Sequence, residues 1–189
     1  PYRDGPVYDS RESAEQGLVK HYEESRRAFT ECQVLIMTPG QNEAWVNKND
    51  GFAWYLKPTA EILAEYGEDH FFPKRYTLKE NVENLTGALH LLWANNPNVH
   101  VIFTVSPVPS WATFYDTNVA VRSFENKAIL LLAVKEVVNQ NPGRTFYFPS
   151  FEIATMSHNW NLQLDNRHVR PKVVKEIMSS FDRRFVTNG

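Results

Sequence analysis

Three short, mainly apolar runs limit most strongly what this chain can fold into. They span residues 34–37, 99–105 and 145–148, and a proline follows each of them within two residues. Proline cannot donate to a strand ladder, so it ends a strand. An unbroken apolar run such as 34–37 is typical of a strand that is covered on both faces. We therefore expect three buried strands.

Helical patterns lie between these runs. Residues 13–31 and 77–95 each open with a capping box, a hydroxyl residue followed three positions later by Gln or Glu, and the first box begins at Ser13. Two further helices are predicted over 123–140 and 171–185. The positions expected to face inward in the first helix are Leu18, Tyr22 and Phe29.

Helices that alternate with strands predict an α/β fold class, a three-layer αβα protein with a parallel sheet between its helices. In such sheets, binding sites lie beyond the carboxyl ends of the strands. The segments that follow the three strands are 38–43, 106–110 and 149–153. We expect all three segments to line one edge of the sheet.

Composition limits the number of domains that the chain can form and the classes of partner that we expect it to bind. The 189 residues 1–189 fit one domain. The chain has 20 Lys and Arg against 22 Asp and Glu, so no basic face is implied and neither a nucleic acid nor a membrane partner is expected. Cys32 is the one cysteine, which favours a cytoplasmic location. The sequence holds no metal-ligand or phosphate-loop motif, so we expect no metal and no cofactor.

Residues 41–76 form a long segment without clear periodicity, rich in aromatic side chains. A connection of this length is usually functional or disordered, and the aromatic content argues against disorder. We expect an irregular, packed excursion over a site. Trp45 and His70 are its candidate substrate-binding residues.

Two polar segments follow the first and second strands. A glycine at position 40 lets a backbone amide approach a ligand closely, and Asn42 offers a side-chain amide, so the two could stabilise an oxyanion. A simple Gly/Asn turn explains the same pattern equally well. Ser106 could contact substrate, although capping of its own backbone is the favoured interpretation.

Asp165 and His168 form the third candidate. A carboxylate three residues before a histidine can hold the imidazole in the tautomer that leaves its other nitrogen free as a base. A surface turn produces the same spacing more often. The chain has no Gly-x-Ser-x-Gly elbow that would present a nucleophilic serine beside this base.

Several short sequence motifs, in their order and spacing, resemble those of the GSCFA family. They are TPGQNEAW at 38–45, FTVSPVP at 103–109, Asn126-Lys127-Ala128 and YFPSFEI at 147–153. The GSCFA family is similar to the SGNH/GDSL hydrolases, flavodoxin-like α/β esterases and acyl hydrolases. The resemblance implies ester hydrolysis or O-acyl transfer, on an ester that could be linked to a carbohydrate.

The resemblance also implies roles for single residues. His168 and Asp165 match the terminal Asp-x-x-His block, in which the histidine is the base and the aspartate orients it. Gly40 and Asn42 match the glycine–asparagine block that supplies oxyanion donors. Glu43 and Ser106, together with Trp45 and His70, are the candidate substrate-binding residues.

No segment matches the GSCFA motif that would carry the nucleophilic serine on the first strand. We therefore expect the serine and the first strands of the fold to lie outside this chain, in an N-terminal segment or a second subunit with which it associates. On that view the 189-residue chain alone is inactive. The alternative is a non-catalytic module that binds a glycan or a protein in the same cleft.

Overall fold

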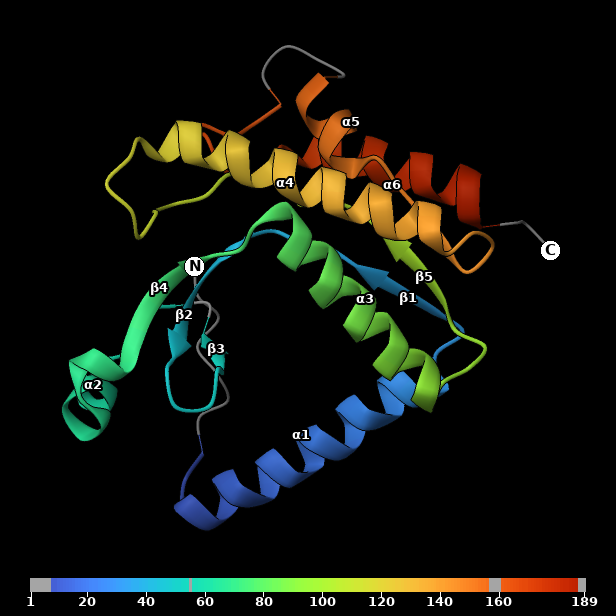
Figure 1. Ribbon diagram of the computed structural model, residues 1–189. Coiled ribbons are helices and arrows are strands. Elements are labelled where there is room, and N and C mark those ends of the chain that lie inside the picture. The colour runs from blue at the N-terminus through green and yellow to red at the C-terminus, as the bar shows by residue number, and fades with distance from the viewer. Residues whose placement is uncertain (1–7, 55, 157–160, 187–189) are drawn as a thin grey trace.

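The computed structural model describes residues 8–54, 56–156 and 161–186 (Figure 1). Its elements in chain order are α1 (Arg11–Glu31), β1 (Val34–Met37), β2 (Glu43–Asn47), β3 (Ala53–Trp54), α2 (Ala60–Tyr66), the 3-10 helix η1 (Glu68–His70), β4 (Phe71–Arg75), α3 (Leu78–Asn95), β5 (His100–Phe103), α4 (Val119–Gln140), β6 (Thr145–Tyr147), α5 (Ser150–Met156) and α6 (Pro171–Phe185).

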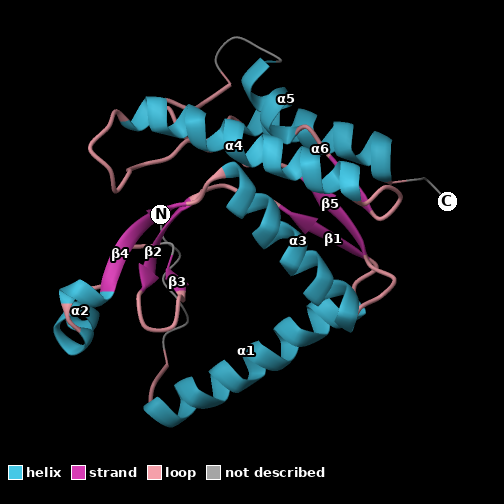
Figure 2. Cartoon of the chain, viewed as in Figure 1, coloured by secondary structure: helices cyan, strands magenta, loops and turns pink. Residues whose placement is uncertain are grey.

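The three predicted strands form one parallel sheet in the order β1-β5-β6 (Figure 2). Leu35 pairs with Val101 across the first ladder, and Val101 pairs with Thr145 across the second. Helices flank this sheet, which confirms the α/β class with a parallel sheet between helical layers. Because all three strands run the same way, their carboxyl ends meet at one edge.

The core lies between the sheet and the helices α3 and α4. Its buried side chains are Leu89, Val101, Phe103, Val134 and Val137. Alternate strand residues point to this face, as the two-residue period of a strand requires. Replacing a core leucine such as Leu89 by alanine is a change that typically lowers the free energy of unfolding by about 2–5 kcal/mol.

The opposite face of the sheet is covered only in part. α6 reaches it over β6, where the rings of Phe146 and Phe185 lie 6.4 Å apart. On β1, Val34 and Ile36 are 50% and 52% exposed. The prediction that residues 34–37 are covered on both faces is therefore wrong, because β1 is an edge strand with helices over one face only.

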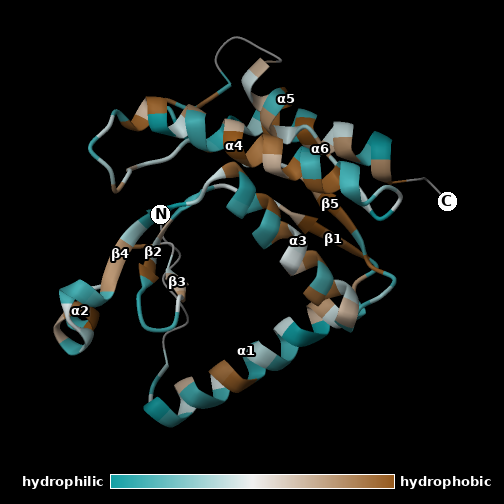
Figure 3. Ribbon diagram, viewed as in Figure 1, coloured by the Kyte–Doolittle hydropathy of each residue, from teal (hydrophilic) through white to brown (hydrophobic). Residues whose placement is uncertain are grey.

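The first helix also differs from its prediction. Leu18, Tyr22 and Phe29 are exposed rather than inward-facing, and no described residue of α1 is buried. The helix begins at Arg11, and the Ser10 hydroxyl accepts from the Ser13 amide, so the cap lies three residues before Ser13. Near its other end, the side chain of Asn96 donates to backbone carbonyls of Phe29 and Cys32. The apolar residues of α1 thus lack a covering layer among the described residues (Figure 3).

The excursion over residues 41–76 is packed but not irregular. It forms an antiparallel sheet in the order β3-β2-β4, with α2 and η1 between β3 and β4. Ala44 and Val46 of β2 are buried and their neighbours are less so, which is the alternation of a half-buried strand. Each strand is too short for this alternation to be recognised against its aromatic neighbours.

The remaining helices agree with the sequence in large part. α3 has the predicted capping box, in which Thr77 and Glu80 bond each other's backbone amides. α4 begins at Val119, four residues earlier than expected, because Asn118 caps it. α6 begins at Pro171 as expected, and the short helix α5 was not predicted. None of the helices in the described part of the chain has the length and apolar character needed to cross a membrane.

Candidate functional site

The carboxyl ends of β1 and β5 meet, as predicted, in a polar region against α4. The Thr104 amide donates to the Met37 carbonyl (3.0 Å), and the Ser106 amide donates to the Pro39 carbonyl (3.0 Å). The segments 38–43 and 106–110 therefore lie side by side. The first half of α4 faces them with polar side chains that are buried: Arg122, Ser123, Asn126 and Lys127.

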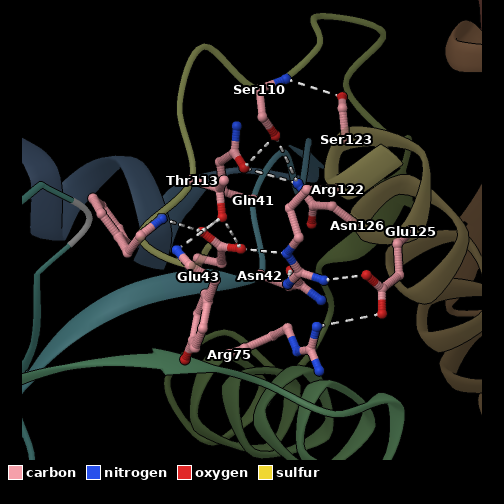
Figure 4. Close-up of polar contacts among 12 residues, drawn as sticks. Gln41, Asn42, Glu43, Arg75, Ser110, Thr113, Arg122, Ser123, Glu125 and Asn126 are labelled. Carbon is pink, nitrogen blue, oxygen red and sulfur yellow. Dashed lines mark hydrogen bonds and ion pairs between the residues drawn. The ribbon is translucent and has the colours of Figure 1, made fainter. Parts of the chain in front are cut away.

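The first part of this region is the Arg122 cluster, which we define as Asn42, Glu43, Arg122 and Glu125 (Figure 4). The Arg122 side chain is only 1% exposed. Its Nε donates to Glu43 Oε1, and its terminal nitrogens donate to Asn42 Oδ1 (3.0 Å) and Glu125 Oε2 (2.8 Å). The arginine is thus fully paired.

Glu43 and Asn42 are held inside this cluster. The Glu43 carboxylate also accepts from Thr113 Oγ1 at 2.9 and 3.0 Å and from the Phe114 amide. Asn42 is buried, and its Nδ2 donates to the Tyr76 carbonyl at 3.2 Å. Both side chains have protein partners in this structure, and their predicted contacts to an oxyanion and a substrate stay predictions.

Gly40 lies where the two loops approach most closely. Its carbonyl accepts from Lys127 Nζ (2.9 Å) and Asn126 Nδ2 (3.2 Å). A Cβ at Gly40 would lie 3.4 Å from the Ser106 Cβ, so Gly40 and Ser106 are direct neighbours. Ser106 Oγ accepts from the Val108 amide at 3.3 Å, which is the backbone capping favoured from the sequence.

The two candidate substrate-binding residues of the segment 41–76, Trp45 and His70, lie outside the Arg122 cluster. Trp45 in β2 packs edge-on against Phe114, with ring centroids 5.5 Å apart. His70 ends η1, and its Nδ1 is buried without a hydrogen-bond partner among the described residues. The structure does not bring either residue to the cavity described below.

Asp165 and His168 contact each other directly. The His168 ring pairs through Nδ1 with Asp165 Oδ2, and Asp165 Oδ1 accepts from the amides of Arg167 and His168 (3.0 Å each). The bond from His168, followed by these two amides, holds the pKa of the Asp165 carboxyl well below its usual range. An ionised carboxylate only accepts, so Nδ1 carries the proton and Nε2 remains available. The side chains of His168 and Asp165 are 50% and 43% exposed.

A cavity of about 820 Å³ lies beside these residues, and we call it the α4 cavity. It is lined by α4, α5, the loop 107–109 and the loop 161–166, mainly with apolar side chains. Lys127 lines it and is buried, and this burial lowers the pKa of Lys127 from an ordinary value of 10.5 to about 8. Asn161 also lines it and is only 6% exposed, and neither polar atom of its side chain has a hydrogen-bond partner among the described residues.

One neighbour of each half of the predicted site lines the α4 cavity. Lys127 contacts Gly40 and lines the cavity, while Asn166, another lining residue, lies between Asp165 and His168 in the chain. The next residue, Arg167, places its guanidinium 4.8 Å from the ring of Trp111. His168 and Gly40 do not line the cavity themselves, and each is linked to it through one neighbouring residue, Asn166 or Lys127.

Arg122, Lys127 and Asn161 were not identified as site residues from the sequence. The sequence pointed to one of them only through the motif Asn126-Lys127-Ala128, which is among the motifs that resemble the GSCFA family. That motif alone assigns no role to Lys127. Within the described residues, no three His, Cys, Asp or Glu side chains are grouped so that they could hold a metal ion.

Together, fold and site define an α/β protein whose polar site lies at the carboxyl edge of a parallel sheet. The family model for the GSCFA family matches residues 4–181. This match spans most of the chain, so the chain belongs to the GSCFA family. No curated protein matches it.

Proposed function

We propose that this chain carries the acid–base part of an SGNH-type esterase or O-acyltransferase, with His168 as the general base and Asp165 as its positioning residue. The observation that supports the proposal best is the side-chain pair of His168 and Asp165 in the loop that borders the α4 cavity. A paired Nδ1 fixes the tautomer in which Nε2 can accept a proton.

In the proposed reaction, Nε2 of His168 takes the proton of a serine hydroxyl as that oxygen attacks the carbonyl carbon of an ester. The resulting imidazolium is stabilised by the Asp165 carboxylate, and it returns the proton to the leaving alkoxide. The Gly40 amide, which makes no hydrogen bond within the described residues, is the proposed oxyanion donor. Water or an acceptor hydroxyl, such as that of a sugar, then removes the acyl group.

The proposed serine comes from a segment other than the described residues, because among them no hydroxyl group bonds to His168. The expected partner is accordingly an N-terminal segment or a second subunit. Hydrolysis of p-nitrophenyl acetate by the 189-residue chain alone, abolished by His168→Ala, would contradict this placement of the nucleophile.

The test uses the protein expressed at native length from its own gene, with p-nitrophenyl acetate as substrate. His168→Ala is expected to lower kcat by about 10²–10⁴-fold, and Asp165→Asn by a similar factor, because the imidazole loses its tautomer. His90→Ala on α3 is the matched control, since His90 is exposed and lies outside the site. Equal rates for all three variants would exclude His168 as the base.

A second candidate function is a non-catalytic module that binds a protein or a glycan. The exposed apolar side chains of α1 and β1 favour a protein partner, since contiguous exposed apolar surface usually marks an interface. This alternative gains if the native-length protein hydrolyses no ester and His168→Ala leaves binding of its partner unchanged.

A further inference from the structure

The α4 cavity contains two polar side chains for which the protein supplies too few partners. Lys127 is buried, and its one hydrogen bond within the described residues goes to a neutral carbonyl, that of Gly40. No carboxylate of the described residues pairs with its ammonium group. A buried cation without an anion is costly, so such a group normally has a charged partner.

Asn161 repeats this pattern at another wall of the same cavity. Asn161 is more than nine-tenths buried, yet neither its amide nitrogen nor its amide oxygen is bonded to any residue that the structure describes. Buried polar atoms in folded proteins are nearly always paired, and an exception needs an explanation. Oxygen atoms of a ligand in the cavity could accept from Lys127 Nζ and from Asn161 Nδ2.

The rest of the cavity has the opposite character. Phe124, Leu131, Phe151 and Met156 contribute to its largely apolar lining. Its volume of about 820 Å³ lies within the range of roughly 300–1,000 Å³ that is typical of small-molecule sites. A ligand that matches these walls has an apolar body and one polar end.

We propose that the α4 cavity binds an extended acyl chain rather than an acetyl group, with its carboxylate or ester carbonyl accepting from Lys127 Nζ and Asn161 Nδ2. This assignment extends the proposed esterase function, because it names the acyl group of the substrate. Only the binding of an ester rests on that function, whereas binding of the free acid does not. The free fatty acid is the corresponding product of hydrolysis, and it keeps the acyl chain and the carbonyl oxygen of the ester.

Calorimetric titration of the chain with butanoate, hexanoate, octanoate and decanoate tests the chain-length preference. Each added methylene group is expected to tighten Kd by about fourfold until the cavity is filled. Lys127→Met is expected to weaken decanoate binding by about tenfold or more, since hydrogen bonds to charged groups are among the strongest. Lys135→Met, on the exposed side of the same helix and outside the cavity, is the matched control.

A second variant separates ligand binding from a structural role. Asn161→Leu removes two unpaired buried polar atoms, so it is expected to raise the Tm of the ligand-free chain while weakening decanoate binding. A merely structural Asn161 would give a lower Tm. Ala128→Trp narrows the cavity from an exposed lining position and is expected to abolish decanoate binding with butanoate binding retained.

The outcomes distinguish this inference from the esterase proposal. Decanoate that binds no more tightly than butanoate, or that binds Lys127→Met and Asn161→Leu as it binds the native chain, overturns the cavity assignment. Native-length protein that hydrolyses p-nitrophenyl decanoate and acetate equally well through His168 overturns it as well. Decanoate binding that depends on Lys127, without any ester hydrolysis that depends on His168, supports the cavity and excludes the esterase.

Discussion

Two buried cations lie on the same helix, less than two turns apart, and their surroundings differ. Arg122 has three acceptors, two of them carboxylates, and is 1% exposed. Lys127 has one neutral carbonyl and an apolar cavity beside it. The Arg122 network, in which each guanidinium nitrogen has an acceptor, fixes the geometry of the loops around it. Lys127 is the cation for which we propose a ligand. We therefore distinguish the scaffold of the site, around Arg122, from its proposed binding part, around Lys127.

Arg122→Met gives the largest effect that this comparison predicts. It leaves the buried Glu43 carboxylate without its cation, so the free energy of unfolding is expected to fall by about 3–5 kcal/mol. Urea unfolding of the 189-residue chain measures the loss. Arg11→Met is the control, because the side chains of its pair with Glu15 are 92% and 63% exposed and an exposed pair contributes at most about 1 kcal/mol. A loss below about 1 kcal/mol for Arg122→Met would remove the distinction between the two cations.

The incomplete pairing of Lys127 is expected to make the free energy of unfolding depend on pH. Its pKa is about 8 in the folded chain against an ordinary value of 10.5. Above pH 8 the folded chain has released this proton while the unfolded chain still holds it, so unfolding takes up a proton and rising pH favours folding. The free energy of unfolding of the native chain should therefore increase relative to that of Lys127→Met between pH 7.5 and 9.5. Lys135→Met should follow the native chain, and parallel curves for native chain and Lys127→Met would contradict the lowered pKa.

The sequence was sufficient for those parts of the fold that local patterns determine. Thr77 and Glu80 form the predicted cap, and residues 34–37 form a strand of the parallel sheet. What covers an element is a tertiary property. The apolar residues of α1 and the outer face of β1 follow helix and strand periodicity, but periodicity carries no information on whether a second layer lies against them.

The candidate site was predictable where its partners are close in sequence. Asp165 and His168 are three residues apart, and their pair could be anticipated from that spacing. Arg122 and Glu43 are 79 positions apart in the sequence, and Lys127 and Gly40 are 87 positions apart. The pattern of the α4 residues in a single sequence does not distinguish buried polar residues with such distant partners from the exposed polar residues of any amphipathic helix. Asn161 is notable only because its partners are absent, which no residue pattern reveals.

Ser123→Ala gives the smallest predicted effect and tests the boundary between the two regions. The Ser123 hydroxyl accepts from the Ser110 amide at 3.0 Å and so attaches the loop after β5 to α4. Its loss is expected to lower the free energy of unfolding by about 0.5–1.5 kcal/mol and to speed hydrogen exchange at the Ser110 amide. Ser25→Ala on α1 is the control, since the Ser25 hydroxyl makes no hydrogen bond within the described residues. Because Ser123 also lines the α4 cavity but keeps its methylene group as alanine, decanoate affinity should change less than threefold. A larger loss of affinity would assign Ser123 to the binding part of the site and move the boundary toward Arg122.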